Sequence, residues 1–319
     1  MVTSIDIVIV NWNAGPQLAH CLESIVAAGR NGIHIRRIVV VDNGSFDDSL
    51  PTREIAGLAP IMIRNERNRG FARACNQGAA NSSADYLLFL NPDTSLLNNS
   101  LAEPVAFMER GENRRIGILG IQLLDTDGRI APTCARFPTP VRFFATMLGL
   151  DRALPGVFPP HFMVEWDHKQ SREVDQVIGA FFLVRRSVFE DLGGFDERFF
   201  VYFEEVDLSL RARALGWPTF YLSTVQAYHH GSGRMRKQEQ ATRLFYSLRS
   251  RILYAYKHFS TWSATFVTLG TLFLEPVSRF AVAVIRRSPS QLAETVKAYA
   301  LLWLALPGRF GAARRPEGA

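Results

Sequence analysis

Cysteine is scarce in this sequence, with three among 319 residues, at positions 21, 75 and 134. The three lie far apart, are odd in number and do not form the short paired spacings of a zinc site. These features exclude a disulfide framework and fit a reducing, cytoplasmic compartment best. The chain enters apolar sequence at Ile5 with no basic segment or cleavage site before it, so we expect no signal peptide.

Acidic residues are scarce near the C-terminal end. Residues 231–319 contain 14 Lys and Arg but only 4 Asp and Glu, whereas residues 1–230 contain 22 and 26. A nearly neutral body with a basic tail indicates a polyanionic partner, either a membrane or a nucleic acid. No base-reading motif accompanies the tail, so we expect an anionic membrane surface and no nucleic acid.

Short apolar runs recur in the first third of the chain, at Ile5–Val10, Ile38–Val41, Ile61–Ile63 and Tyr86–Leu90. Segments with helical spacing lie between them, the clearest being Leu18–Ile25. Strands that alternate with helices predict right-handed β-α-β units and a mostly parallel sheet. A Gly-x-Gly-x-x-Gly fingerprint is missing, which disfavours the usual dinucleotide-binding fold. We therefore expect this part of the chain to bind a nucleotide in another way.

The run Tyr86–Leu90 ends at the most informative turn. Five consecutive apolar residues predict a strand buried on both faces of a sheet. Pro92 cannot donate to a sheet ladder, so the strand ends there. Asp93 is then expected at the carboxyl-terminal edge, where open α/β sheets bind ligands. A carboxylate there suits a hard cation and a diphosphate, although a simple Pro-Asp turn explains the same residues.

Asp42 ends the second predicted strand in a similar way. Its carboxylate can accept a hydrogen bond from a ribose hydroxyl or from an imino N–H of a base. The sequence Asp-Asn-Gly-Ser at 42–45 fits an Asx turn or a helix N-cap equally well.

Later apolar segments predict further strands at Ile116–Gly120, Gly179–Val184 and Trp217–Val225. Residues Thr133–Asp167 are rich in Pro, Phe and Arg and show little periodicity, so we expect loops and short elements that cover the site. The last strand leads to the pair of histidines at 229 and 230, followed by glycine. A structural role and a ligand role are both reasonable for this pair.

Three acidic residues, Glu204, Glu205 and Asp207, open a predicted helix behind an aromatic run. Capping is one explanation, because a helix dipole stabilises acids at its N-terminus. Three acids within four residues exceed what capping requires, and their mutual repulsion would raise at least one pKa, which suits a general base. Positions 204 and 207 share a helix face while position 205 points about 100° away, so we expect Glu205 to face a substrate.

Together these motifs resemble the family 2 glycosyltransferases, which are inverting, nucleotide-sugar-dependent enzymes of the GT-A fold. Among them, the bacterial rhamnosyltransferases are the most similar. The resemblance is carried by the order and spacing of short motifs between residue 5 and about residue 232. The matching segments are 8–13, 41–45, 68–72, 91–93, 179–182, 193–200, 204–208 and 229–231.

The resemblance implies an α/β fold of the GT-A type, Rossmann-like with a mostly parallel central sheet, over residues 1–235. A basic, amphipathic, membrane-associating helical appendage would follow over residues 236–319. The resemblance also implies a set of residues that contact the donor nucleotide-sugar, among which Asp42 would hold the nucleotide base. These residues are Asn11, Asn13, Asp42, Asn43, Arg69, Gly70, Asn91 and Asp93.

The resemblance further implies that Asp93 and His229 hold Mg²⁺ or Mn²⁺, and that Glu205 is the catalytic base. Two residues depart from the family pattern. Asn91 stands where the metal motif has its first acid, and Glu205 stands where the base is more often Asp. Asp93 is therefore expected to be the main carboxylate ligand.

The implied reaction moves a sugar, in the first place L-rhamnose, from dTDP-rhamnose or a UDP-sugar to a hydroxyl of a glycan or lipid-linked glycan in cell-envelope polysaccharide synthesis. The metal neutralises the leaving diphosphate, while Glu205 takes the proton from the acceptor hydroxyl. Attack opposite the leaving group inverts the anomeric configuration. The alternatives are a galactofuranosyl or other hexosyl transferase of the same family, or a non-catalytic nucleotide-binding or membrane scaffold protein.

Residues 240–306 show apolar residues at helical spacing with basic residues between them. The run Trp262–Leu274 has 13 uncharged residues, too few to span a bilayer alone, and Glu275, Pro276 and Arg279 interrupt the apolar sequence beyond it. We therefore expect peripheral helices on the cytoplasmic face of the cytoplasmic membrane. A membrane hairpin and a helix pair that packs its own core remain alternatives.

Overall fold

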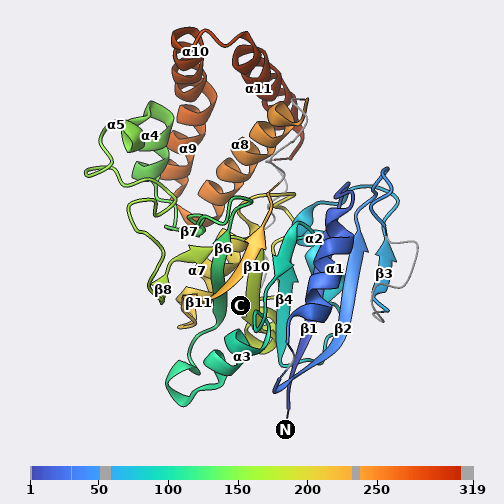
Figure 1. Cartoon of the computed structure of the whole chain (residues 1–319). Coiled ribbons are helices and arrows are strands. Elements are labelled where there is room, and N and C mark those ends of the chain that lie inside the picture. The colour runs from blue at the N-terminus through green and yellow to red at the C-terminus, as the bar shows by residue number, and fades with distance from the viewer. Residues whose placement is uncertain (1, 30, 51–58, 232–237, 310–319) are drawn as a thin grey trace, which may run out of the picture. The chain divides into compact units, whose positions relative to one another are not determined.

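The computed structural model describes residues 2–29, 31–50, 59–231 and 238–309 (Figure 1). The chain divides into two compact units. The first, here called the sheet unit, consists of Met1–Pro138 and Pro160–Gly233. The second, the helical unit, consists of Thr139–Pro159 and Arg234–Ala319. The domain boundary expected between residues 235 and 236 falls outside the described residues.

Within the described residues of the sheet unit, nine strands form one sheet: β1 (Thr3–Asn11), β2 (Ile33–Asp42), β3 (Ile61–Arg64), β4 (Tyr86–Leu90), β5 (Thr94–Leu96), β6 (Ile118–Leu124), β8 (Arg172–Val174), β10 (Phe181–Arg185) and β11 (Thr219–His229). Their order is β3-β2-β1-β4-β10-β6-β11-β5, with β8 paired to β11. The first four strands in this order are parallel. β10 runs antiparallel to β4 and β6, and β11 runs parallel to β6. A second small sheet pairs β7 (Cys134–Ala135) with β9 (Gln176–Val177).

Helices cover both faces of the large sheet. One face carries α1 (Gln17–Ala27) and α3 (Ala102–Glu109), and the other carries α2 (Phe71–Ala79), α6 (Arg186–Asp191) and α7 (Glu204–Ala214). β1 contributes to both cores, because Ile9 lies in the core under α1 while Val8 lies in the core under α2. A strand buried on both faces has a continuous apolar sequence, and this pattern made the parallel half predictable. The predicted α/β fold with a mostly parallel central sheet is confirmed.

The predicted and observed strand bounds agree best where the apolar pattern of the strand itself determines them. β4 has the predicted bounds, Tyr86–Leu90. β11 continues past its predicted end at Val225 to His229, because its last residues pair with β5, where Tyr228 lies opposite Ser95. That pairing joins segments far apart in the sequence, which a local pattern cannot reveal.

Within Thr133–Asp167, where loops and short elements are expected, residues 139–159 form two short helices. These residues form α4 (Pro140–Leu148) and α5 (Leu150–Ala153) and belong to the helical unit. Thr139 caps α4 by accepting a hydrogen bond from the Arg142 N–H (3.2 Å), and Gly149 ends it in a left-handed conformation. Helices this short show too few apolar repeats for periodicity to identify them.

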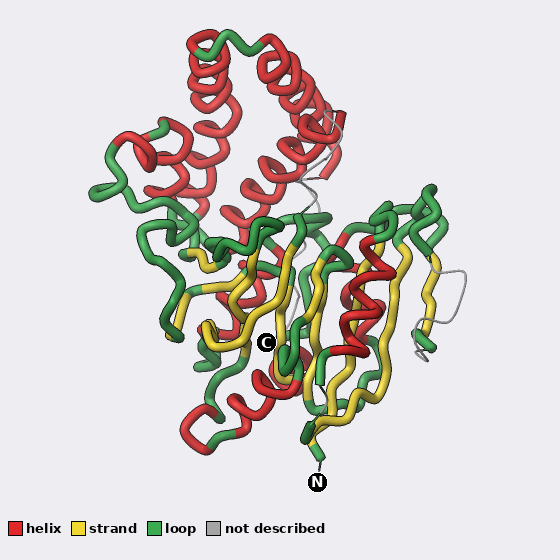
Figure 2. Tube along the Cα trace, in the orientation of Figure 1, coloured by secondary structure: helices red, strands yellow, loops and turns green. Residues whose placement is uncertain are grey.

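The helical unit is completed by α8 (Gln238–His258), α9 (Thr261–Leu269), a π-helical segment η2 (Gly270–Leu274), α10 (Glu275–Ile285) and α11 (Pro289–Arg309) (Figure 2). Its core joins α8, η2 and α11 and contains Leu248, Ile252, Leu272, Tyr299 and Leu302. α4 approaches η2 closely at Gly270, where a Cβ would come within 2.8 Å of the Phe144 ring.

α9, η2 and α10 form one continuous helix, Thr261–Ile285, which runs through Glu275, Pro276 and Arg279, the residues that interrupt the apolar sequence. The wide π turn before Pro276 accommodates a residue without an N–H. Glu275 is buried but pairs with Arg251 of α8 and with Arg279 (2.7 Å). Among the described residues this is the one helix long and apolar enough to cross a membrane, a property of length and composition that core helices of soluble proteins can share.

Candidate active site

The ends of β1 and β2 place the first predicted residues together. Asn11 and Asp42 are the last residues of these strands and lie opposite each other in the parallel register. Asn11 Nδ2 lies within hydrogen-bond distance of Asp42 Oδ1 (3.0 Å), Ser45 Oγ (3.0 Å) and Ser49 Oγ (2.9 Å). Asp42 is buried, and no described residue donates to its Oδ2. Asn11 therefore fixes the Asp42 carboxylate with one oxygen left for a ligand.

Asn13 organises the loop beyond β2. Its backbone is left-handed (φ 54°), its N–H donates to Ser45 Oγ (2.9 Å), and its Oδ1 accepts from the Phe46 N–H (2.9 Å). The amide nitrogen of the Asn13 side chain makes no hydrogen bond with the described residues, so this group is available to a ligand.

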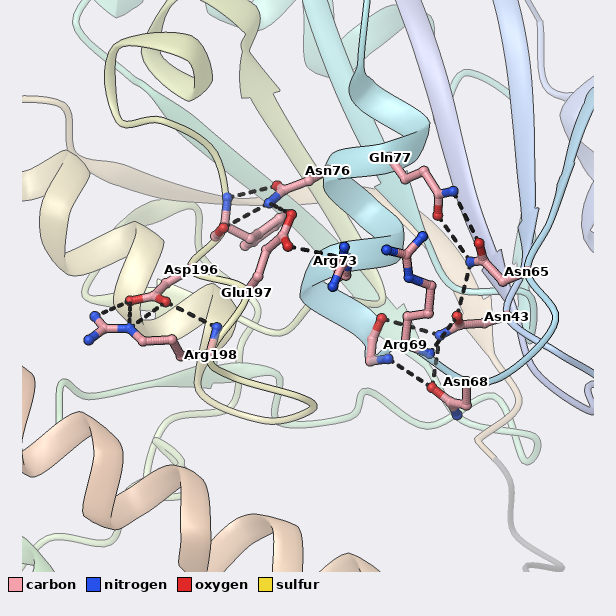
Figure 3. A network of polar contacts seen from close by, with 12 residues as sticks. Asn43, Asn65, Asn68, Arg69, Arg73, Asn76, Gln77, Asp196, Glu197 and Arg198 are labelled. Atoms are coloured by element: carbon pink, nitrogen blue, oxygen red, sulfur yellow. Dashed lines mark hydrogen bonds and ion pairs between the residues drawn. The ribbon is translucent and has the colours of Figure 1, made fainter. Parts of the chain in front are cut away.

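A network of amide side chains shapes the loop before α2 (Figure 3). Asn43 is buried, and its Oδ1 accepts from the Arg69 N–H (3.0 Å) and from Asn65 Nδ2 (3.2 Å). Its Nδ2 donates to Asn68 Oδ1 (2.9 Å) and to Gly70 O (3.2 Å). Both ends of the Asn43 amide are used inside the protein. Asn43 thus shapes this loop through its whole side-chain amide.

Gly70 and Arg69 occupy the N-terminus of α2. Gly70 has φ 93°, and a Cβ on it would lie 2.7 Å from Phe200 O, so the position requires glycine. The Phe71 N–H donates to the same carbonyl (2.6 Å). The guanidinium of Arg69 makes no hydrogen bond or ion pair with the described residues and extends from this loop (Figure 3). The helix N-terminus and this cation together suit an anionic ligand.

Asp93 and His229 form the second group of predicted residues. The turn that follows β4 is closed by the Thr94 N–H donating to Asn91 O (3.1 Å), and β5 then pairs with β11 so that His229 lies opposite Thr94. His229 Nε2 lies 3.3 Å from Asp93 Oδ1, a buried oxygen that accepts no hydrogen bond from the described residues. The His230 side chain has a different partner, because its Nε2 forms a hydrogen bond with Ser95 Oγ (2.9 Å).

This pair fits a divalent ion. Two atoms that bind one ion at about 2.1 Å lie about 3 Å apart, close to the separation of Asp93 Oδ1 and His229 Nε2. No cluster of three or more His, Cys, Asp or Glu side chains occurs in the described part of the chain. Mg²⁺ commonly takes one or two protein ligands and completes its shell with water and substrate phosphates. Asn91 provides no charge at this site.

The acids at the start of α7 have different surroundings. Asp207 is buried and accepts from Arg211 Nε (2.8 Å), and Arg211 also donates to Leu192 O (2.7 Å) and Gly194 O (2.9 Å). Asp207 therefore stabilises the fold by positioning Arg211 against the turn before α7. Glu204 is buried, whereas Glu205 is partly exposed. Glu204 and Asp207, which share a helix face by spacing, are both buried, and Glu205 on a different face is the partly exposed one.

Burial raises the pKa of the Glu204 carboxyl, and the neighbouring charge of Glu205 raises it further. Burial also raises the pKa of Glu205, and the backbone N–H groups of Glu205 and Val206 offset part of this effect. The Oε2 atom of each side chain is buried and accepts no hydrogen bond from the described residues. Glu205 thus combines increased proton affinity with partial access to solvent, as a general base requires.

Asn76 is a structural contributor that the sequence pattern did not indicate. Its Nδ2 donates to Phe195 O (2.8 Å) and its Oδ1 accepts from the Phe195 N–H (2.9 Å), as Figure 3 shows for this part of the network. Because Arg211 holds Gly194, Asn76 connects α2 to α7 through one turn. A single polar residue in a helix carries no local signal for such a distant partner.

One family model, Glycosyl transferase family 2, matches residues 6–193. The chain belongs to this family. The matched range includes the strand ends at Asn11, Asp42 and Asp93, whereas Glu205 and His229 lie beyond it. The predicted resemblance to family 2 glycosyltransferases is confirmed, and the chain is a glycosyltransferase.

Relatives with similar sequences support this conclusion. An N-acetylglucosaminyl-diphospho-decaprenol L-rhamnosyltransferase of Mycobacterium tuberculosis is 26% identical over 83% of this chain and 88% of that protein. The low-salt glycan biosynthesis hexosyltransferase Agl10 of Haloferax volcanii is 25% identical over 82% of this chain and 78% of Agl10. Rhamnosyltransferase WbbL of Escherichia coli is 28% identical over 46% of this chain and 52% of WbbL.

Solved structures confirm the fold class. The mannosyltransferase PcManGT from Pyrobaculum calidifontis, in complex with GDP-Man and Mn²⁺, has a TM-score of 0.56 and 14% identity over 94% of this chain and 86% of that chain. GalNAc-T7, with UDP, GalNAc and Mn²⁺, has a TM-score of 0.55 and 16% identity over 90% of this chain and 59% of that chain. Together with family membership, this fold identifies a GT-A glycosyltransferase that uses a nucleotide-sugar.

Proposed function

We propose that this enzyme moves L-rhamnose from a dTDP- or UDP-linked donor to a hydroxyl of a lipid-linked glycan, with inversion, in cell-envelope polysaccharide synthesis. The observation that carries the proposal is the similarity to the Mycobacterium tuberculosis rhamnosyltransferase, which covers 83% of this chain and 88% of that protein. The name of that relative describes an N-acetylglucosaminyl-diphospho-lipid acceptor. An acceptor of the same class is proposed for this chain.

The donor nucleotide is assigned to the ends of β1 and β2. Asp42 Oδ2 and the Asn13 amide nitrogen are an acceptor and a donor that the described part of the chain leaves without a partner. They suit the imino N–H, carbonyl and hydroxyl groups of a pyrimidine nucleoside. Arg69 and the N-terminus of α2 suit its diphosphate.

Asp93 and His229 are assigned to a divalent cation, Mg²⁺ or Mn²⁺. When bound, such an ion supplies positive charge that stabilises the departing diphosphate. The chain's contribution is to fix the two ligands: the turn at 91–93 sets the carboxylate, and the β5-β11 pairing sets the imidazole. Asn91 keeps the local negative charge one unit lower than an Asp at this position would.

Glu205 is assigned the role of general base. It accepts the proton of the acceptor hydroxyl as the oxygen attacks the anomeric carbon, and the nucleoside diphosphate leaves from the opposite face. One catalytic carboxylate is enough, because the leaving group already carries its charge on phosphate. Glycosidases need a second carboxyl group to protonate the leaving oxygen.

We also propose that the helical unit attaches the enzyme peripherally to the cytoplasmic face of the cytoplasmic membrane. Large apolar side chains are exposed along Thr261–Ile285 at a spacing of three or four residues: Trp262, Phe266, Leu269, Phe273, Val277, Phe280 and Val284. Such a stripe marks an interaction surface. The basic residues of the same unit complement anionic lipids, which favours a membrane as the partner.

A second donor class has support of its own, because Agl10 is named a hexosyltransferase and covers a similar share of this chain. The deciding experiment offers dTDP-rhamnose and a panel of UDP-hexoses, with Mn²⁺ and an N-acetylglucosaminyl-diphospho-lipid, and measures release of nucleoside diphosphate. We expect dTDP-rhamnose to give the fastest release of nucleoside diphosphate. NMR of the product should show an anomeric configuration opposite to that of the donor. Transfer from UDP-hexoses alone would favour the second class, and no release from any donor would contradict a catalytic role.

A further inference from the structure

The helical unit contains a cavity of about 400 Å³ that takes no part in the site of the sheet unit. Its walls come from five helices, and α5 contributes Arg152. α4 contributes Met147, α8 contributes Leu244, α10 contributes Val282 and α11 contributes Thr295. These helices belong to one compact unit, so the cavity is a feature of that unit by itself.

Charged side chains make up much of the remaining lining. Three arginines, Arg152, Arg279 and Arg286, share the cavity with Glu275 and Glu294. Asp151 next to Arg152 is not part of the lining.

Both carboxylates of the lining have partners within the protein. Burial would raise the pKa of Glu275, but Arg251 and Arg279 lower it below its ordinary value, so this carboxylate is ionised and neutralised. Glu294 accepts from the amide of Gln240 when that amide turns its nitrogen toward the carboxylate (2.7 Å). Glu275 is thus neutralised by its own arginines, whereas Glu294 keeps its charge and offsets only one of the two remaining arginines, so the lining has an excess of positive charge.

Arg152 and Arg286 are the lining arginines without an ion-pair partner among the described residues. Their guanidinium groups make no hydrogen bond or ion pair with the described residues, although both line the same cavity from α5 and from the end of α10. Two such groups on one cavity favour an anion.

The cavity lies on the opposite side of α10 from the exposed apolar stripe. The cavity-lining positions of this helix are 275, 278, 279, 282 and 286, which share one face at 100° per residue. The stripe positions Val277, Phe280 and Val284 lie about 180° away on the same helix. The cavity is therefore a separate feature from the surface assigned above to the membrane.

We propose that this cavity binds a phosphate or diphosphate group. A guanidinium offers paired N–H donors that match phosphate oxygens, and a charge-assisted pair is stronger than a neutral hydrogen bond. The apolar part of the wall, which includes Met147, Leu148 and Leu244, accommodates an aliphatic chain next to the phosphate. The group can come from a free diphosphate or from a lipid headgroup. The proposal does not depend on the donor sugar proposed above.

The test uses the full chain and two binding measurements that need no turnover. Inorganic pyrophosphate is titrated calorimetrically in excess EDTA, which removes any metal that would hold it at Asp93. Flotation compares phosphatidylcholine vesicles that contain phosphatidic acid with vesicles that contain phosphatidylserine at equal charge. The cavity variant is Arg152→Gln/Arg286→Gln. The matched control is Arg287→Gln/Lys297→Gln, which removes the same charge from residues of the same unit outside the cavity.

We expect the wild type to bind pyrophosphate in EDTA and the cavity variant to bind it about tenfold or more weakly, with the control close to wild type. That result identifies a free diphosphate as a ligand. A preference for phosphatidic acid that the cavity variant loses and the control keeps identifies a lipid headgroup. Equal effects of both double variants, or the absence of both binding signals in the wild type, would overturn the proposal.

Discussion

His229 Nε2, at the end of β11, lies 3.3 Å from Asp93 Oδ1, in the turn between β4 and β5, although the two residues are far apart in the sequence. The antiparallel pairing of β5 with β11 creates this contact, because it sets His229 opposite Thr94, the residue after Asp93. The same pairing turns His230 toward Ser95. Two adjacent histidines therefore have different partners, and they form a matched pair for testing the metal site.

His229→Gln should lower the affinity for Mn²⁺ and reduce kcat at limiting metal by about tenfold or more, because one of two protein ligands is lost. His230→Gln should leave the metal dependence nearly unchanged. Asp93→Ala and excess EDTA should each abolish turnover. Calorimetric Mn²⁺ binding and the Mn²⁺ dependence of kcat check these outcomes. Full activity in chelator would contradict a metal at this position.

Glu205→Gln should reduce kcat by on the order of 10²–10⁴, because the amide keeps the shape of the side chain but cannot accept the proton. The donor Kd should barely change, since the groups assigned to the nucleotide are elsewhere. Glu204→Gln is the matched control and should retain most of kcat. If Glu204→Gln silences the enzyme while Glu205→Gln does not, the assignment within this pair is wrong.

The raised pKa of Glu205 predicts how activity changes with pH. A base must be ionised, so kcat should be low in acid, rise with pH through a pKa above the ordinary carboxyl value, and then level off. Glu205→Gln should remove this rise from the residual activity. A pH–rate profile from about pH 5 to pH 9 measures the effect. A profile that is already level at the acid end of this range would contradict the role of burial.

The turn between α6 and α7 allows the contact with Asn76 to be isolated. Gly193 and Gly194 both have positive φ (70° and 75°), but a Cβ at Gly194 would lie 2.7 Å from Asn76 Oδ1 while a Cβ at Gly193 meets nothing within 4 Å. Each substitution by Ala costs about 1–2 kcal/mol of backbone strain. Gly194→Ala should cost more, because it also displaces Asn76 from Phe195. Urea denaturation of both variants gives the difference, and equal losses would show that the Asn76 contact contributes nothing.

The apolar stripe predicts binding to anionic vesicles. Phe266→Ser/Val277→Ser removes two large exposed side chains from it and should weaken vesicle binding about tenfold or more. Val164→Ser removes a similarly exposed side chain from the sheet unit and should have little effect. Co-sedimentation with phosphatidylglycerol vesicles measures both. A chain that remains in the soluble fraction after low-salt lysis without detergent would contradict membrane attachment.

The predictable part of this protein is the part with local signals. β4 and the ends of β1 and β2 follow from apolar runs broken by polar turns, which is why Asp42 and Asp93 were identified as site candidates from the sequence. Helical spacing also separated Glu205 from Glu204 and Asp207. The roles of Asn43 and Asn76 could not be predicted, because each depends on partners that the fold brings from elsewhere.

The helical unit shows the same limit. Its helix continues past Pro276 because a π turn precedes that residue and because Arg251, from another helix, neutralises Glu275. A charged residue followed by proline normally indicates the end of an apolar helix, but the pairing of Glu275 with an arginine of another helix allows this helix to continue. α4 and α5 are too short to show a period and pack into a unit otherwise formed by the C-terminal part of the chain.

The three cysteines provide intrinsic reporters of local opening. The Cys21 thiol donates to Asn91 O (3.6 Å) beneath the turn that carries Asp93, and Cys75 lies on α2, where burial and the charges of Glu204 and Glu205 raise the pKa of its thiol. Cys134 is buried in β7. A thiol reagent reaches each sulfur only when its surroundings unfold transiently. The labelling rates of Cys21 and Cys75 therefore report separately on the opening of the metal turn and of the segment beside the base, without any probe being introduced.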